Sequence, residues 1–349
     1  MIISRTPFRV SFFGGGTDYP EWYREHGGAV LATTIDKYCY LTCRYLPPFF
    51  EHKIRIIYSK IENCMTVDDI RHPSAREVIR YLAIDRGLEI HHDADLPARS
   101  GLGSSSAFTV GLLHALYALQ GRMVGKNELT REAIHIEQDV LRETVGSQDQ
   151  ASTAHGGFSG ELVVTPVAAT SGRIHELNDN CLLFYTGIKR TAETVARSYV
   201  DDINSKKRQL RLMKDLTDEA VTIFSTGVDL KAFGYLLHEA WEAKRSLSAQ
   251  VSNSDVDDIY RIARSNGASG GKLLGAGGGG FFLVFAAPDR HHAIRQALSK
   301  LVFVPFRFEF SGSQVIFMDR EQDYLEVESQ AVPARRFREL DAAGDPAAD

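Results

Sequence analysis

The chain has 349 residues, of which 44% are hydrophobic and 24% charged, and its formal net charge is −5. This size suits one large domain or two smaller ones, and the mildly acidic balance gives no electrostatic basis for binding nucleic acid. No apolar run approaches the ~20 residues of a membrane helix, so no membrane association is expected. The N-terminal sequence lacks the long apolar stretch of a signal peptide, which predicts a cytoplasmic protein.

A strand is predicted over residues 2–13, because apolar side chains recur there at alternate positions. Arg9 lies within this strand, and a charge in a mostly apolar strand needs a partner. Three glycines, residues 14–16, follow directly and lead into Thr17 and Asp18. This stretch is either a plain glycine turn capped by Asp18 or the polar edge of a pocket.

Further elements of the first hundred residues are strands at about 29–35, 38–45, 53–58 and 89–93, and a helix at about 75–87. The four cysteines form no CxxC pair, and the histidines include no HExxH motif. Buried free thiols are therefore favoured over a disulfide or a metal site, and the sequence predicts no zinc site.

A turn rich in glycine and serine, residues 100–106, runs directly into a helix predicted at 107–119. This helix is apolar almost all round and should be buried, so its N-terminus points out of the core. The glycines let a ligand approach the backbone, and the free N–H groups of the first turn favour an anion. The hydroxyls of Ser104, Ser105 and Ser106 add donors and one candidate magnesium ligand. Read alone, the stretch is equally consistent with a serine-capped buried helix after a flexible loop.

The next helix is predicted at about 128–144, and it carries Glu137 within its apolar stripe. A carboxylate in that position is costly unless it is paired, protonated or bound to a metal, and both a buried salt bridge and a metal ligand remain open. Gly146 is placed to end this helix. Asp149 then begins another segment.

The chain is expected to divide near residue 170, with domains at 1–170 and 171–330 and a disordered tail at 331–349. The second domain should begin with helices and end with a mixture of helix and strand. Its predicted helices lie at about 191–224, 233–249, 256–265 and 290–301. Strands are predicted at about 162–165, 181–185, 281–286, 303–310 and 314–319.

Residues 275–280 satisfy the pattern GxGxxG, which is the fingerprint of dinucleotide-binding proteins. That reading is rejected because the fingerprint must follow a strand and open a helix, whereas this stretch precedes a strand. The chain also lacks the GxxxxGK[ST] motif of P-loop proteins.

Three stretches in order, residues 7–18, 96–107 and 272–285, resemble the three motifs of the GHMP kinases, a family that includes galactokinase, homoserine kinase and mevalonate kinase. The resemblance covers about residues 1–320. It implies an α+β protein with the two-domain GHMP kinase fold. The N-terminal domain would resemble ribosomal protein S5 domain 2, the C-terminal domain would be a ferredoxin-like α/β sandwich, and the active site would lie in the cleft between them.

The same resemblance implies an ATP-dependent kinase that uses Mg²⁺. The residues that it implies for binding the ATP phosphates are Ser100, Gly101, Leu102, Gly103, Ser104, Ser105 and Ser106. Ser105, with Ser104 as its neighbouring alternative, and Glu137 would ligate the metal. Asp149 matches the catalytic aspartate, which accepts the proton of the attacking hydroxyl. Arg9 matches the basic partner of that aspartate.

Within the family, the Gly-Gly-Gly-Thr-Asp sequence of residues 14–18 is similar to the branch that phosphorylates D-glycero-D-manno-heptose 7-phosphate, and galactokinases have a Gly-Glu-His-Thr-Asp type of sequence there. The implied reaction phosphorylates the anomeric hydroxyl to give the 1,7-bisphosphate, toward nucleotide-activated heptose for surface polysaccharide. L-fucokinase-type domains share these features, so an L-fucokinase- or galactokinase-like sugar 1-kinase remains an alternative. A sugar- or nucleotide-binding regulator on the same fold is the non-enzyme alternative.

The partners implied are a small-molecule sugar phosphate and ATP, and the sequence leaves a monomer and a homodimer open. Gly16, Thr17 and Asp18 are the expected contacts to the sugar hydroxyls. Lys189 and Arg190 are the first candidates for binding the sugar phosphate. Further cationic candidates are Lys37, Lys244 and Arg245.

Overall fold

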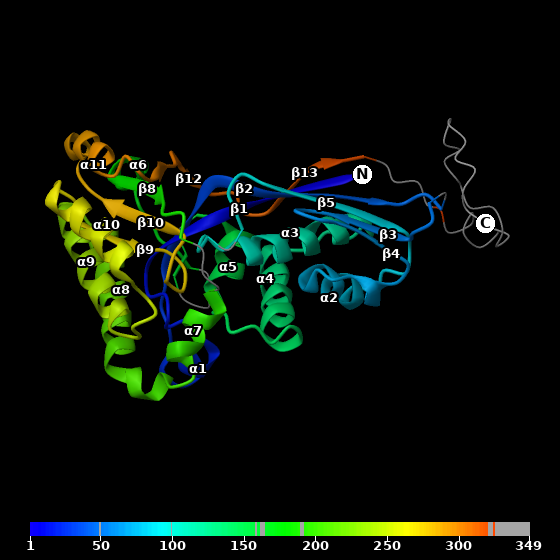
Figure 1. Ribbon diagram of the computed structural model, residues 1–349, viewed down its shortest axis with the longest axis horizontal. Coiled ribbons are helices and arrows are strands. Elements are labelled where there is room, and N and C mark those ends of the chain that lie inside the picture. Colours follow the sequence, from blue (N-terminus) through cyan, green and yellow to red (C-terminus); the bar gives the residue numbers. More distant parts are fainter. Residues whose placement is uncertain are drawn as a thin grey trace, which may run out of the picture.

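Two long antiparallel strands, β1 (Ile2–Phe13) and β2 (Leu31–Tyr45), form the centre of the first half of the molecule. Both strands are labelled in Figure 1, which draws the computed structural model of the protein. The structure describes residues 1–48, 50–98, 100–157, 159–160, 165–188, 192–319 and 324. The two strands predicted at 29–35 and 38–45 are one continuous strand, β2. The pairing of β1 with β2 shifts register between Pro7 and Phe8, so the residues between the two predicted strands are accommodated as a local irregularity within β2.

The first sheet has the order β13-β1-β2-β5-β3-β4, β6 and β12 also pair with β2, and β7 pairs with β6. Only β3 and β5 pair in parallel among its described pairs. The bounds are β3 Ile54–Ile57, β4 Ile61–Cys64, β5 Leu88–Ala94, β6 Ser159–Gly160, β7 Thr165–Pro166, β12 Phe308–Glu309 and β13 Gln314–Met318.

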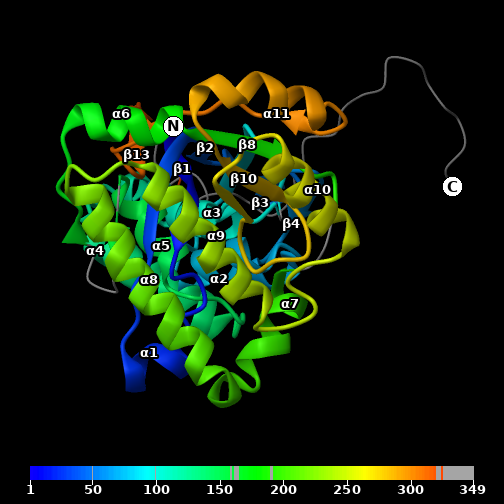
Figure 2. The same cartoon turned by 90° about the vertical axis from the view of Figure 1, so that its left-hand side faces the viewer.

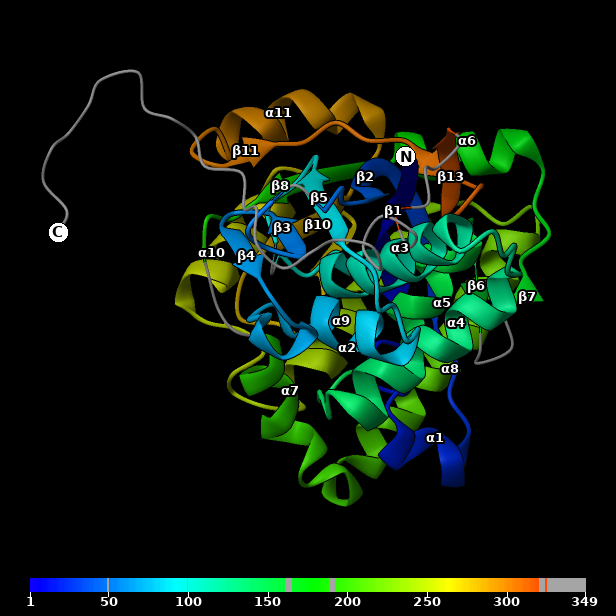
Figure 3. The same ribbon diagram turned by 90° about the vertical axis from the view of Figure 1, so that its right-hand side faces the viewer.

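Four helices cover one face of this sheet, with α3 (Ser104–Leu119) packed directly on β1 and β2 (Figures 1 and 3). Gly111 allows that packing, because a Cβ there would lie 2.8 Å from Oγ1 of Thr6, and its carbonyl oxygen accepts a hydrogen bond from Ser4 at 2.8 Å. The other three helices are α2 Pro73–Tyr81, α4 Lys126–Ile134 and α5 Gln148–His155. The buried position predicted for the apolar helix is therefore confirmed.

The helix predicted at 128–144 is shorter than expected. It ends as α4 at Ile134, continues as a π-helical turn over His135–Val140, and stops where Arg142 takes a positive φ of 55°. Gly146 therefore does not end it. A π-helical turn inserts an extra residue into a helix, and such turns are frequent at functional sites. Glu137 lies within this turn.

The second sheet is antiparallel, with the order β11-β8-β10-β9. α9 and α10 pack against it, and Figure 2 shows α8 beside α9. Its strands are β8 Cys181–Tyr185, β9 Gly270–Leu273, β10 Phe281–Phe285 and β11 Val302–Phe303. The helices of this half are α6 Ser171–Asp179, α7 Ala192–Val200, α8 Lys207–Ser225, α9 Lys231–Arg245, α10 Ser254–Ser265 and α11 His291–Ala297. Short elements elsewhere are α1 Pro20–His26 and the 3₁₀ turns Val67–Asp69, Ile203–Lys206 and Pro288–Arg290.

The last two described strands depart from the sequence prediction, which placed them at the end of the second domain. β12 pairs with β2 and β13 pairs with β1, so both complete the first sheet. The ring of Phe308 in β12 lies edge-on to Phe12 at 6.1 Å, which buries part of this strand beside the end of β1. Local alternation predicts that a strand exists, but it does not specify which sheet the strand joins.

The end of β1 also packs against the second half of the chain. The rings of Phe12 and Phe13 contact Phe233 of α9 with centroids 5.5 and 5.0 Å apart. The division of the chain near residue 170 stays a prediction, and the tail predicted at 331–349 lies outside the described residues. None of the described helices combines the length and apolar character needed to cross a bilayer.

Candidate functional site

An ion pair joins β1 to the first turn of α5. Arg9 Nε donates to Oδ1 of Asp149 and Nη2 donates to Oδ2, each at 2.7 Å. The side chain of Arg9 is only 2% exposed, whereas that of Asp149 is 25% exposed. A bidentate pair fixes the orientation of a carboxylate as well as offsetting its charge. The partner predicted for the buried arginine is thus Asp149, whose carboxylate can still be reached by a ligand.

The glycine- and serine-rich turn wraps around this pair. Arg9 Nη1 donates to the carbonyl oxygen of Gly101 at 2.6 Å, and the Arg9 backbone N–H donates to that of Leu102 at 3.0 Å. Gly103 has a φ of 75°, and a Cβ there would lie 3.2 Å from Cγ of Arg9 and 3.4 Å from Oδ2 of Asp149. The backbone angle therefore favours glycine at this position, and a Cβ there would make a tight contact with Arg9.

The N-terminus of α3 opens beside the ion pair. Its N-cap residue is Gly103, which has no side chain to cap it. The backbone N–H groups at a helix N-terminus and the helix dipole favour an anion. Ser100 is buried, and its carbonyl oxygen accepts a hydrogen bond from the N–H of Phe281 at 3.1 Å, which ties the turn to β10.

Glu137 is fully buried at 0% exposure, and two side chains donate to its Oε2 atom. These donors are Ser106 Oγ, at 2.8 Å, and Gln150 Nε2. Its other oxygen, Oε1, has no hydrogen-bond partner among the described residues. Burial raises the pKa of this carboxyl to about 7, and the nearby charge of Glu143 adds to the effect. The buried salt bridge that the sequence left open is not observed among the described side chains.

A hard cation fits this arrangement. Mg²⁺ is usually held by one or two carboxylates together with waters and substrate phosphates, so three protein carboxylates are not required. The described residues contain no group of three or more His, Cys, Asp or Glu side chains suited to a metal. The unpartnered Oε1 of Glu137 is an oxygen ligand of the right type. The structure brings Ser106 to Glu137, whereas Ser105 is exposed, so a metal role for Ser105 stays a prediction.

Asp18 lies in the turn that leaves β1, almost fully buried. Its Oδ1 accepts a hydrogen bond from the N–H of Gly16 at 2.8 Å. Burial raises the pKa of this carboxyl, and the charge of Asp149 acts in the same direction. A Cβ at Gly146 would lie 1.8 Å from Oδ2 of Asp18, so that glycine serves close approach rather than helix termination. The predicted sugar contact at Asp18 thus lies near the Asp149 carboxylate.

Thr17 is hydrogen-bonded within the turn that follows β1. Its hydroxyl donates to the carbonyl oxygens of Gly14 and Ala29, at 2.8 and 2.9 Å, and its side chain is fully buried. The hydroxyl therefore holds the turn, and a sugar contact by Thr17 stays a prediction. Lys189 and Arg190, the first candidates for the sugar phosphate, lie outside the described residues.

Two buried lysines, Lys244 and Lys272, are each 3% exposed and interact electrostatically with Asp18. Lys244 Nζ donates to the carbonyl oxygen of Gly275, and Lys272 Nζ donates to that of Phe12 at 2.8 Å. Lys244 was only a secondary candidate in the sequence, and Lys272 had no role assigned. The sequence does carry a signal that Lys244 is buried. Lys244 follows Trp241 by three residues, so the two side chains lie on the same, apolar face of α9.

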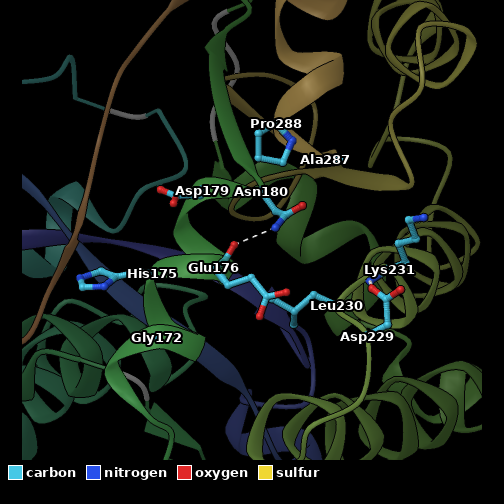
Figure 4. Close-up of a pocket in the computed structure, with 10 residues that line it drawn as sticks. All are labelled: Gly172, His175, Glu176, Asp179, Asn180, Asp229, Leu230, Lys231, Ala287 and Pro288. Carbon is cyan, nitrogen blue, oxygen red and sulfur yellow. Dashed lines mark hydrogen bonds between the residues drawn. The ribbon is translucent and has the colours of Figure 1, made fainter.

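A cavity of about 500 Å³ lies elsewhere, between α6, the start of α9 and the turn after β10 (Figure 4). Its lining is Gly172, His175, Glu176, Asp179, Asn180, Asp229, Leu230, Lys231, Ala287 and Pro288. It contains none of the predicted site residues. The site is therefore identified by its polar groups rather than by this cavity.

Two family models match the chain: the GHMP kinases N terminal domain over residues 72–157 and the GHMP kinases C terminal over residues 227–302. A mevalonate kinase from Methanothermobacter thermautotrophicus is 31% identical over 232 residues, which cover 60% of this chain and 72% of that protein. The chain belongs to the GHMP kinase family. The family and the fold predicted from the three motifs are confirmed.

Two further proteins that are similar to this GHMP kinase are named as kinases of heptose phosphates. A D-glycero-alpha-D-manno-heptose 7-phosphate kinase from Campylobacter jejuni is 27% identical over 330 residues, covering 86% of this chain and 93% of that protein. The crystal structure of a D-glycero-D-manno-heptose 1-phosphate kinase from Bacteroides thetaiotaomicron aligns with a TM-score of 0.74. That alignment covers 92% of this chain and 100% of the other at 24% identity, so it supports the fold alone.

Proposed function

We propose that this GHMP kinase uses ATP to phosphorylate the anomeric hydroxyl of D-glycero-D-manno-heptose 7-phosphate. The product would be the 1,7-bisphosphate, formed in the cytoplasm toward nucleotide-activated heptose for surface polysaccharide. The observation that carries phosphoryl transfer is the bidentate Arg9–Asp149 pair beside the uncapped N-terminus of α3. The choice of the heptose as substrate is supported by the Gly-Gly-Gly-Thr-Asp sequence and by the similarity to the Campylobacter jejuni protein.

The chemistry follows from the positions of these groups, because phosphoryl transfer depends mostly on positioning and charge stabilisation. The N–H groups at the start of α3 and of the preceding turn bind the phosphates of ATP. A sugar hydroxyl beside Asp149 transfers its proton to the carboxylate while its oxygen bonds to the γ-phosphorus, and ADP leaves. Arg9 keeps the carboxylate aimed at that hydroxyl through two hydrogen bonds.

Glu137 and the two side chains that donate to it are the proposed site for Mg²⁺. When bound, this ion neutralises charge on the transferring phosphates. Ser106 and Gln150 orient the carboxylate through Oε2, which leaves Oε1 available as a ligand. Gln150 directly follows the catalytic aspartate, so one turn of α5 serves both the base and the metal ligand.

The test is an assay of the purified protein with ATP, Mg²⁺ and a panel of sugars and sugar phosphates, with both ADP and the phosphorylated product measured. We expect turnover with D-glycero-D-manno-heptose 7-phosphate and a product phosphorylated at the anomeric oxygen. ADP formation with L-fucose or galactose, but not with the heptose, would overturn the substrate. Nucleotide binding without turnover of any sugar would instead favour a regulator on the same fold.

A further inference from the structure

Lys244 occupies an unusual position for a lysine. It lies in the last turn of α9 with 3% exposure, and its ammonium group donates to the backbone carbonyl of Gly275. Within the described part of the chain it forms no ion pair with a carboxylate. Burying an ammonium group without such a partner lowers stability, so a function that needs the charge is a reasonable explanation for its position.

Four other charged groups, on the elements around it, interact electrostatically with Lys244. Arg9 comes from β1, Asp18 from the turn after β1, Asp149 from α5 and Lys272 from β9. Three cations therefore surround two carboxylates. The excess of positive charge suits a site that receives a polyanion such as ATP.

A chain of contacts connects Lys244 to the catalytic pair. The Gly275 carbonyl that accepts from Lys244 belongs to residues 275–280, the third glycine-rich stretch of the chain after residues 14–16 and 100–106. A Cβ at Gly275 would lie 2.6 Å from Cα of Gly101, so the two turns are in direct contact. Gly101 in turn accepts a hydrogen bond from Arg9 at 2.6 Å, and Arg9 pairs with Asp149.

We propose that Lys244 is a positioning residue for phosphoryl transfer. Its ammonium group balances the Asp18 and Asp149 carboxylates and holds the third glycine-rich stretch against the phosphate-binding turn. This inference rests on the proposed kinase function but not on the identity of the sugar. A purely structural lysine is the competing explanation, and it predicts loss of stability rather than loss of rate.

The charge of Lys244 gives the inference a pH signature. The pKa of this lysine is lowered to about 8, mainly by burial and also by the charge of Arg9, while Asp18 and Asp149 act in the opposite direction. Lys244 is therefore cationic below about pH 8 and loses its proton above it. The value of kcat/KM should fall as the pH rises through that range, because the positioning charge is lost.

The experiment compares Lys244→Met, which removes the charge, with Lys244→Arg, which keeps it at every accessible pH. Lys126→Met is the matched control, since Lys126 Nζ also donates to backbone carbonyls, those of His155 and Ser311 at 2.9 and 2.5 Å. The full-length variants are assayed for kcat, for KM of ATP and sugar, for melting temperature, and for kcat/KM from pH 6 to 10.

We expect Lys244→Met to lower kcat about 100-fold, as for loss of one preorganised electrostatic group, without lowering the melting temperature. Lys244→Arg should recover most of this loss and move the alkaline limb to higher pH. Lys126→Met should lower the melting temperature and leave kcat unchanged. Near-full kcat in Lys244→Met, or a loss that Lys244→Arg does not rescue, would overturn the inference.

Assays of the wild-type protein test the proposed substrate separately from the role of Lys244. Turnover of another sugar contradicts the heptose assignment, and the variants are then compared with that sugar. A wild-type protein that turns over no sugar contradicts the kinase function and this inference together.

Discussion

At the scale of single residues, the site is a set of buried charges whose partners come from distant parts of the chain. Arg9 is paired with Asp149 by two hydrogen bonds, and Glu137 is held by hydroxyl and amide donors. Among the described residues, Lys244 donates to a backbone carbonyl and forms no ion pair. Buried charges that are incompletely paired are costly to stability. Their arrangement around an uncapped helix N-terminus therefore indicates function rather than stabilisation.

Asp149→Asn tests the proposed base. The amide keeps the size of the side chain but cannot accept the proton of the sugar hydroxyl, so we expect kcat to fall about 10²- to 10⁴-fold. ATP affinity, measured by calorimetry with a non-hydrolysable analogue, should change little because the phosphate-binding N–H groups are intact. A rate close to that of the wild type would remove Asp149 from the base role.

Glu137→Gln tests the proposed metal ligand. The amide can still receive a hydrogen bond from Ser106 but is a poorer ligand for Mg²⁺, so the Mg²⁺ concentration for half-maximal rate should rise by about 10- to 100-fold. The free energy of unfolding should not fall, because a buried carboxylate is replaced by a neutral group. An unchanged Mg²⁺ requirement would exclude Glu137 as a ligand.

Stability at different pH values tests the burial of Lys244. Its pKa is about 8 in the folded protein, below its value of 10.5 as a free side chain, so the folded state binds fewer protons than the unfolded state between these values. The free energy of unfolding should therefore rise with pH over that window. A shift of this size corresponds to about 3 kcal/mol.

Lys244→Met should consequently be more stable relative to the wild type at pH 7 than at pH 10. Urea unfolding of both proteins at the two pH values measures the difference. A difference that does not change with pH would show that the lysine is not held in the environment described here.

At the scale of elements, two turns and one helix make the phosphate-binding site. The turn before α3 is confined between the Arg9–Asp149 pair on one side and the third glycine-rich stretch on the other. A Cβ at Gly101 would lie 2.5 Å from the carbonyl oxygen of Leu274, and one at Gly280 would lie 2.3 Å from that of Ser100. The glycines thus serve close backbone packing between two halves of the chain.

Gly103→Ala tests this packing, with Gly121→Ala as the matched control. Both glycines have similar positive φ angles, 75° and 74°, but only Gly103 lies against other groups, since nothing lies within 4 Å of a Cβ at Gly121. Each substitution should cost about 1 kcal/mol of stability through the backbone angle. Gly103→Ala should in addition raise KM for ATP and lower kcat, because its methyl group displaces Arg9 or Asp149. Equal kinetics in the two variants would contradict the proposed crowding.

At the scale of the whole molecule, the end of β1 connects both halves. Phe12 and Phe13 reach the ring of Phe233 in α9, and this ring also packs on Phe285 of β10 at 5.6 Å. The same strand carries Arg9, a few residues earlier. β1, which supplies Arg9 to the ion pair, is thus part of the first sheet and is linked through Phe233 to the second sheet. This packing explains how the site residues from the two halves keep their relative positions.

Phe233→Ala should lower the free energy of unfolding by about 3–5 kcal/mol, because it leaves a cavity between the two halves. Tyr235→Ala, on the exposed side of the same helix, is the control and should cost less than about 0.5 kcal/mol. Urea unfolding followed by tryptophan fluorescence and by circular dichroism measures both. Coincident transitions are expected if the halves unfold together, and two separate transitions would contradict a shared core.

The sequence by itself determined the family, the motifs and most of the strands and helices, because these depend on residue type at short range. Alternating apolar positions predicted β1, and a run that is apolar almost all round predicted the buried helix α3. A carboxylate in an apolar stripe identified Glu137 as a candidate site residue before any contact was known. The pairing of Arg9 with Asp149 was also implied, but only by resemblance to the family.

Only the tertiary structure decided how distant segments meet. It assigned β12 and β13 to the first sheet, and it showed that the helix predicted at 128–144 ends in a π-helical turn after α4. It also showed that Gly146 makes room for Asp18. It also brought Lys244 and Lys272 to the site, of which only Lys244 is a candidate from the sequence, and a secondary one. The physical reason is that strand pairing, close backbone contact and the burial of a charge depend on residues far apart in the chain.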